Sequence, residues 1–131
     1  MGKEVIKTDR VSPPVGPYSL AVKATGPLLF ISGAVGFGPD GKIVGGGFAA
    51  QCRQAYENIK ILLEEAGASF KDVVRFTNYL VNAEDYPIMA EIRKEYFKGV
   101  TDYPASTLIE VKGLLYKDLL VEIDTIAVLN R

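Results

Sequence analysis

The chain has 131 residues, of which 48% are hydrophobic and 24% are charged, and its net charge is −1. These values predict a single globular domain over residues 1–131 and exclude an intrinsically disordered chain. The balanced charge argues against nucleic-acid binding, because phosphate contacts need clustered positive charge. We expect no membrane span, since no apolar run is long enough, and a cytoplasmic location, since residues 1–10 lack the apolar segment of a signal peptide.

Histidine is absent and cysteine occurs once, which narrows the chemistry open to the chain. Without histidine, histidine-based catalytic triads and nearly all catalytic zinc sites are excluded. The single cysteine, Cys52, allows no intrachain disulfide, and its place on the apolar face of a predicted helix indicates a core residue. Chemistry is left to carboxylates, hydroxyls, Lys, Arg, backbone amides and ordered water.

The first half of the chain predicts strands followed by a long helix. Short strands are expected at residues 5–8 and 20–24, and the continuous apolar run at 28–31 is typical of a strand buried on both faces. A helix is predicted over residues 48–66, because apolar residues recur there on one helical face, and Gly67 ends it. We interpret the glycines at 45–47 as a flexible bend before this helix, with an anion site at the helix N-terminus as the alternative.

The second half predicts a strand, a helix and two more strands. Residues 73–81 are rich in Val, Thr, Phe and Tyr, and a shorter helix follows at 85–97 with Pro87 in its first turn. The last strands are expected at 105–111 and 119–129. This order favours an α+β fold with helices on one face of a mixed sheet. The other face would be bare, and we expect another subunit to cover it.

Glu122 and Asp124 are two residues apart in the last predicted strand and therefore point to one face of the sheet. They form either a solvated outer face or a carboxylate pair in a cleft, where the charge of one raises the pKa of the other. Apolar Leu120 and Ile126 share that face and favour a partly buried seam. Tyr18, after a Gly-Pro turn, is either a packing residue or a cleft residue.

Five segments occur in an order and spacing that resemble a known family. They are residues 15–19 (VGPYS), 29–33 (LFISG), 51–67 with its N-I-K, 103–105 (YPA) and 121–127 (VEIDTIA). Together they resemble the RidA/YjgF family of enamine/imine deaminases, also described as L-PSP endoribonuclease-like. The resemblance spans nearly the whole chain.

The resemblance implies a chorismate-mutase-like α+β fold and a homotrimer with a central barrel of sheets and the helices outside. It implies a small-molecule ligand in each inter-subunit cleft, with no metal and no cofactor. Typical active members act in metabolite damage control. They hydrolyse reactive 2-imino acids to 2-keto acids and ammonia, with a Glu holding the attacking water and an Arg gripping the substrate carboxylate.

The resemblance assigns family roles to the residues of this chain that match the family's motifs. Glu122 matches the water-positioning Glu and Tyr18 matches the cleft Tyr, so both are predicted to be catalytic. Ser32 and Gly33 match the segment whose backbone lines the pocket. These four residues keep the family pattern.

Three predicted substrate-binding positions depart from the family. Ser106 stands where the family signature has its Arg, Leu108 stands where it has Cys, and Ala90 aligns with a pocket Asn. Losing a bidentate arginine grip costs about 2–5 kcal/mol, or roughly 30- to several-thousand-fold in affinity, unless another subunit supplies a cation such as Arg75 or Arg93. Restoring the signature by Ser106→Arg is therefore expected to raise activity on simple 2-imino acids.

Three functions are compatible with the sequence. The first is an enamine/imine deaminase-type hydrolase whose substrate is not a simple 2-imino acid. The second is a trimeric module that binds a small molecule or a protein without turnover. The third, an endoribonuclease, is least favoured because the chain has no histidine and no excess of basic residues.

Overall fold

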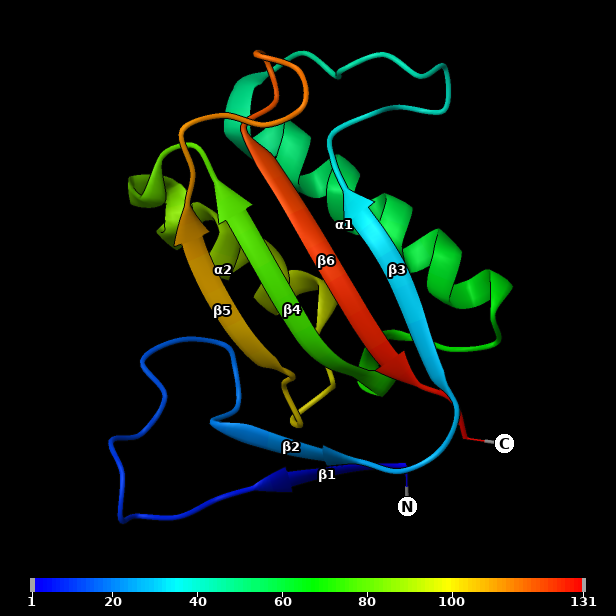
Figure 1. Ribbon diagram of the computed structural model, residues 1–131, viewed down its shortest axis with the longest axis vertical. Helices are drawn as coiled ribbons and strands as arrows, with labels where there is room; N and C mark the ends of the chain where they lie inside the picture. Colours follow the sequence, from blue (N-terminus) through cyan, green and yellow to red (C-terminus); the bar gives the residue numbers. More distant parts are fainter. Residues whose placement is uncertain (1, 131) are drawn as a thin grey trace.

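A computed structural model describes residues 2–130 (Figure 1). Over this range the chain forms six strands and two α-helices. In chain order these are β1 (Lys3–Ile6), β2 (Ala21–Ala24), β3 (Leu28–Ala34), α1 (Gly47–Glu65), β4 (Val73–Leu80), α2 (Tyr86–Tyr96), β5 (Ala105–Glu110) and β6 (Val121–Val128). The helices and strands predicted from the sequence are all present, with ends shifted by a few residues.

The strands form two sheets. The larger has the order β3-β6-β4-β5, in which β4 and β5 are parallel and the other pairs are antiparallel, so the sheet is mixed. Strands β1 and β2 form a separate antiparallel pair. Figure 1 shows α1 and α2 on the same face of the larger sheet, which confirms the predicted α+β class. Strands β3 and β5 are the two edges of this sheet.

Helix α1 buries one face against the sheet. The apolar residues that predicted the helix are those that it buries: Phe48, Cys52, Ala55, Tyr56, Ile59 and Leu63. Cys52 is confirmed as a core residue, and burial raises the pKa of its thiol to about 12. The bend predicted before the helix is confirmed at Gly46, whose φ of 110° lies in the left-handed region that glycine tolerates.

Aromatic rings fill the core between the helices and the sheet. Tyr56, Phe70, Phe97 and Phe76 form a closed ring of four contacts, with centroids 5.3 to 6.0 Å apart. Each such pair contributes roughly 0.5–1.5 kcal/mol beyond the area it buries. The residues come from α1, the turn before β4, β4 and the end of α2, so this cluster fixes the helices on the sheet.

The face of the sheet opposite the helices is bare in the single chain. On β3, Leu28 is 48% exposed and Phe30 is 69% exposed, and both lie on this face. The expectation of a strand buried on both faces is therefore wrong for one chain, because no other part of residues 2–130 covers this side. None of the helices in this range is long and apolar enough to cross a membrane.

Candidate functional site

The seven residues predicted to form the site fall into two groups, one near edge strand β3 of the larger sheet and one near edge strand β5. We call them the β3-edge group, which contains Ser32, Gly33 and Glu122, and the β5-edge group, which contains Tyr18, Ala90, Ser106 and Leu108. Strands β6 and β4 separate the two edge strands. At about 4.8 Å between neighbouring strands, the edges are roughly 14 Å apart.

A β-bulge builds the β3-edge group. The pairing of β3 with β6 shifts between Ile31 and Ala34, so the extra length of β3 falls at Ser32 and Gly33. A Cβ atom built at Gly33 would come to 2.6 Å from Cδ of Glu122. The carboxyl group of Glu122 therefore occupies space that only a glycine leaves free.

Glu122 and Asp124 lie on the bare face of the sheet, as their spacing predicts. Partial burial, and then the charge of Asp124, raise the pKa of the Glu122 carboxyl group. The Tyr79 hydroxyl donates a hydrogen bond of 3.2 Å to Asp124 Oδ2. The charge of Asp124 in turn raises the pKa of Tyr79. The shared face expected from the strand spacing is confirmed, and the choice between a solvated outer face and a cleft depends on what covers this side of the sheet.

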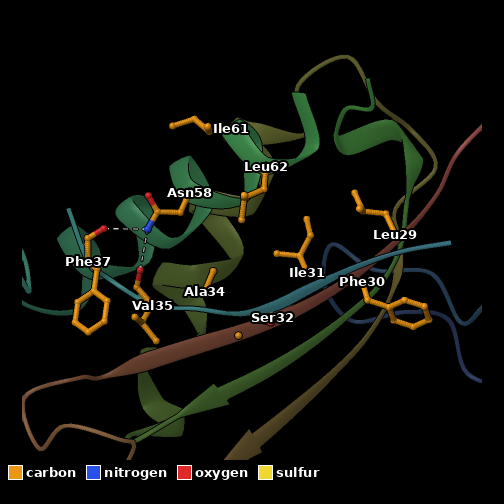
Figure 2. Close-up of a pocket in the computed structure, with 11 residues that line it drawn as sticks. Leu29, Phe30, Ile31, Ser32, Ala34, Val35, Phe37, Asn58, Ile61 and Leu62 are labelled. Atoms are coloured by element: carbon orange, nitrogen blue, oxygen red, sulfur yellow. Dashed lines mark hydrogen bonds between the residues drawn. The ribbon is translucent and has the colours of Figure 1, made fainter. Parts of the chain in front are cut away.

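A groove of about 610 Å³ runs between the free edge of β3 and helix α1. Ser32 and Gly33 line it, together with the exposed apolar side chains of Ile61 and Leu62. Figure 2 shows Ile31 pointing toward the helix and Phe30 pointing away from it. The groove is largely apolar, and Glu122 is not part of its lining.

Asn58 on α1 fixes the backbone at the end of this groove. Its Nδ2 donates to the carbonyl oxygens of Val35 at 3.2 Å and Phe37 at 2.9 Å, the dashed lines in Figure 2. Its side chain is thereby committed to the loop after β3. This bond pattern holds the chain close to the helix directly after the bulge.

The β5-edge group is tied together through backbone contacts. The Tyr18 hydroxyl accepts a hydrogen bond from the Val15 amide at 3.2 Å, and the Ser19 amide donates to the Pro104 carbonyl at 2.9 Å. Tyr18 therefore lies on a loop attached to the start of β5. Leu108 packs against the core, as does Ala90, which is buried on α2.

Two polar side chains lie behind Ser106: Asn78, which the sequence does not assign to the site, and Arg93, which it names only as a cation from another subunit. The Oγ of Ser106 accepts hydrogen bonds from Arg93 Nη1 at 3.1 Å and from Asn78 Nδ2 at 2.8 Å. Of the two arginines that could supply a replacement cation, Arg93 is therefore the one in contact with Ser106. Arg75 donates instead to Thr107 Oγ1 at 2.7 Å.

A sequence signal for Arg93 existed. Met89, Ile92, Tyr96 and Phe97 mark the apolar face of the second helix, and Arg93 lies four residues after the first and four before the last. A charged residue in the middle of an apolar face is buried more often with a partner than without one. Position and spacing together therefore indicated an internal arginine.

One chain does not assemble the two groups into one site. Ser106 faces the helices, where it contacts Arg93, whereas Glu122 lies on the bare face. They lie on different strands, β5 and β6, and on opposite faces of the sheet. Over residues 2–130, no group of three His, Cys, Asp or Glu side chains is placed to hold a metal ion.

Comparison with known proteins identifies relatives along nearly the whole chain. A family model described as Endoribonuclease L-PSP matches residues 9–129. A RutC family protein of Pyrococcus abyssi is 44% identical over 128 residues, which cover 97% of this chain and 98% of that protein. The human 2-iminobutanoate/2-iminopropanoate deaminase is 35% identical over 127 residues, covering 96% of this chain and 90% of that enzyme.

Solved structures agree with the sequence comparison. The structure of YyfB from Yersinia pestis, a protein of unknown function in the conserved Rid family, superposes with a TM-score of 0.90 at 35% identity. The match covers 98% of this chain and 100% of the Yersinia chain. With the family model, the relatives and this fold in agreement, the chain belongs to the RidA/YjgF family, the family described as Endoribonuclease L-PSP.

Proposed function

We propose that this protein hydrolyses a small reactive enamine or imine in a cleft between the subunits of a homotrimer, without a metal or cofactor. The observation that carries the proposal is the Glu122 carboxyl group, which has a raised pKa and rests on a bulge that holds Gly33 beneath it. The relatives of this protein include 2-iminobutanoate/2-iminopropanoate deaminases of human and mouse. We also propose that it works in the cytoplasm, in the control of metabolite damage.

The division of the candidate residues between two sheet edges supports a cleft between subunits. A head-to-tail contact would bring the β5-edge group of one chain to the β3-edge group of the next, and such contacts close into a ring when the rotation fits. The same arrangement would cover the bare face, where Leu28 and Phe30 are exposed. Apolar side chains on one contiguous face favour association in water.

The chemistry balances with water as the only co-reactant. The Glu122 carboxylate takes a proton from a water molecule, whose oxygen forms a bond to the imine carbon. The protonated Glu122 gives that proton to the nitrogen, which yields a carbinolamine. Glu122 then carries the remaining hydroxyl proton to the same nitrogen as the carbon–nitrogen bond breaks, which releases ammonia and leaves a carbonyl compound. A raised pKa suits a carboxyl group to both halves of this proton transfer.

Substrate recognition falls to the β5-edge group. In this proposal Tyr18 borders the reacting centre, Ser106 contacts the substrate, and Leu108 and Ala90 make the wall apolar. Ser32 and Gly33 of the adjacent chain contribute backbone to the opposite wall. Because Ser106 cannot grip a carboxylate in two places as an arginine does, we expect turnover of simple 2-imino acids to be slower than in relatives with the signature arginine.

A coupled assay tests the proposal. The protein is added to a pyridoxal-phosphate dehydratase that releases imines from Ser or Thr, and the formation of 2-keto acid is followed above its spontaneous rate. We expect acceleration by the unmodified protein and none by Glu122→Gln. If the unmodified protein gives no acceleration but still binds the keto acid, the trimer is a binding module and the proposed hydrolysis is wrong.

A further inference from the structure

Arg93 is a fully buried cation without an acidic partner among residues 2–130. It is 0% exposed, and the two ion pairs in this range involve other residues. Its hydrogen bonds go to neutral oxygens, on Tyr56 at 2.8 Å, Asn78 at 2.9 Å, Ser106 at 3.1 Å and the Pro17 carbonyl at 3.2 Å. A guanidinium keeps its proton in proteins, so the charge is uncompensated.

The titratable groups around Arg93 do not cancel this charge at neutral pH. Burial raises the pKa of Cys52 and of Tyr56 to about 12. Burial also raises the pKa of Tyr86. All three side chains are therefore protonated and neutral. The face of the Phe76 ring, 4.7 Å from the guanidinium carbon, adds only a quadrupole.

The orientation of Asn78 follows from its neighbours. Arginine can only donate, so the Asn78 atom 2.9 Å from Arg93 Nη2 is the amide oxygen. The amide nitrogen is then placed to donate both of its hydrogens, one to the Thr107 carbonyl at 2.8 Å and one to Ser106 Oγ at 2.8 Å. The bonds to the Thr107 carbonyl and from Arg93 would both be lost in a flip of the amide, because a carbonyl can only accept and a guanidinium can only donate.

These contacts leave the hydroxyl proton of Ser106 without an acceptor among residues 2–130. A hydroxyl oxygen accepts two hydrogen bonds and donates one. Arg93 and Asn78 supply both of the bonds that Ser106 Oγ accepts, and no other group in residues 2–130 accepts its proton. Ser106 is half-buried on an edge strand, so this proton is available to a ligand.

We infer that Arg93 acts through Ser106 as the anion-recognising group of the site, so that the ligand is a small molecule with a carboxylate oxygen placed against the Ser106 hydroxyl. The inference rests on the proposed function, because it deepens the role given there to Ser106. Arg93 is a positioning residue in this scheme. It holds the Ser106 oxygen, fixes its proton as a donor and supplies the positive potential behind it.

The mechanism differs from an arginine that touches the ligand. One neutral hydroxyl, polarised by a buried cation, replaces two charged N–H donors. Hydrogen bonds that involve a charged group are stronger than neutral ones, so the contact should discriminate a carboxylate from a carboxamide of the same shape. Recognition of an anion therefore does not need an arginine at residue 106.

The experiment measures equilibrium binding of 2-oxobutanoate and of its neutral analogue 2-oxobutanamide by calorimetry. We expect the unmodified protein to bind the anion at least tenfold more tightly than the amide. Ser106→Ala should weaken binding of the anion about 10- to 100-fold, whereas Ser106→Thr, which keeps the hydroxyl, should retain it.

Asn78→Asp is the decisive variant because it changes charge without changing shape. The new carboxylate pairs with Arg93, cancels its charge and accepts the Ser106 proton, and it loses the hydrogen bond that Asn78 donates to the Thr107 carbonyl. We expect the preference for the anion to disappear while the protein stays folded and assembled. Arg75→Gln is the matched control, since it removes an equal charge from the Thr107 side of β5, and it should leave the preference unchanged.

The inference is overturned if the unmodified protein does not bind 2-oxobutanoate, if it shows no preference over the amide, or if Arg75→Gln removes that preference. If Asn78→Asp fails to fold, Ser106→Ala and Ser106→Thr still test the inference, and equal binding of the anion by these two variants would overturn it. The readout needs no turnover. A protein that binds the anion through Ser106 but hydrolyses no imine would uphold this inference and contradict the proposed function.

Discussion

The carboxyl group of Glu122 occupies the space in which a Cβ atom on Gly33 would lie. A Cβ atom at Gly33 would lie 2.6 Å from Glu122 Cδ and 2.7 Å from Glu122 Cγ. The bulge in β3 brings the two residues together, so the position of the carboxyl group depends on the absence of a neighbouring side chain.

Gly33→Ala should therefore displace Glu122. We expect at least a tenfold loss of imine hydrolysis and a stability cost of about 1–3 kcal/mol from overpacking. Kinetic assays and thermal unfolding measure the two effects. Gly45→Ala is the control, because a Cβ there meets nothing within 4 Å, and its activity should stay near that of the unmodified protein. Equal activity of the two variants would contradict the role of Glu122.

Asp124→Asn should change the pH dependence of activity. The charge of Asp124 is the second cause of the raised pKa of Glu122, after burial, so removing it lowers that pKa. If the Glu122 carboxylate takes the proton of water, activity rises with pH through this pKa. The rising limb of the pH–rate profile should therefore move to lower pH. Tyr79→Phe keeps the charge of Asp124, so this variant should not move the rising limb to lower pH.

Ser106→Arg should not restore activity on simple 2-imino acids. The sequence favours restoration, but the structure places a buried cation 3.1 Å from the Ser106 oxygen, and a second guanidinium there is repelled. We expect the substitution to be less harmful to stability when combined with Arg93→Met. A double-mutant cycle in urea should give a coupling of about 1–3 kcal/mol, whereas additive effects would show that the two side chains do not meet.

Mixed assemblies test whether each cleft draws on two chains. Glu122→Gln inactivates one group of the site, and Ser106→Asp, which pairs with Arg93, inactivates the other. After subunit exchange between the two inactive proteins, about a quarter of the clefts in a cyclic trimer would contain both intact groups. Activity should then appear at that fraction. No recovery after proven exchange would place the complete site within one chain.

Phe30→Asp should prevent assembly. Phe30 is exposed in the single chain, so the substitution costs the isolated fold little, but it places an unpaired charge in the proposed interface. Sedimentation at micromolar concentration should give a monomer for this variant and a trimer for the unmodified protein. Ile88→Asp, a similar change on α2, is expected to remain trimeric. A monomeric unmodified protein would contradict the assembly itself.

Periodicity was sufficient to predict the fold. The apolar face of α1 and the β-rich segments at β4, β5 and β6 follow local rules, because a buried helix face repeats every 3.6 residues and strands favour branched and aromatic side chains. The prediction for residues 28–31 was wrong for one chain because a continuous apolar run does not say which face a neighbour covers. Whether a face of the strand is buried depends on the other elements and subunits that pack against it.

The candidate site was predicted only in part. The sequence located Glu122 and Asp124 on one face, since strand alternation is local. It did not reveal the Arg93–Asn78–Ser106 contacts, because these residues come from α2, β4 and β5, and only the packing of the helix on the sheet brings them together. Asn78, between Phe76 and Leu80 on the buried face of β4, carried the same signal of an internal polar group as Arg93.

In the proposed trimer, the placement of Glu122 on β6 and Ser106 on β5, on opposite faces of the sheet, couples ligand binding to protein concentration. In the proposed trimer a lone chain holds only half of each cleft, so dilution removes the site together with the assembly. Ligand that binds the complete cleft draws free chains into trimers by mass action. Cells that lower the amount of this protein would therefore lose its function more steeply than in proportion to the number of chains.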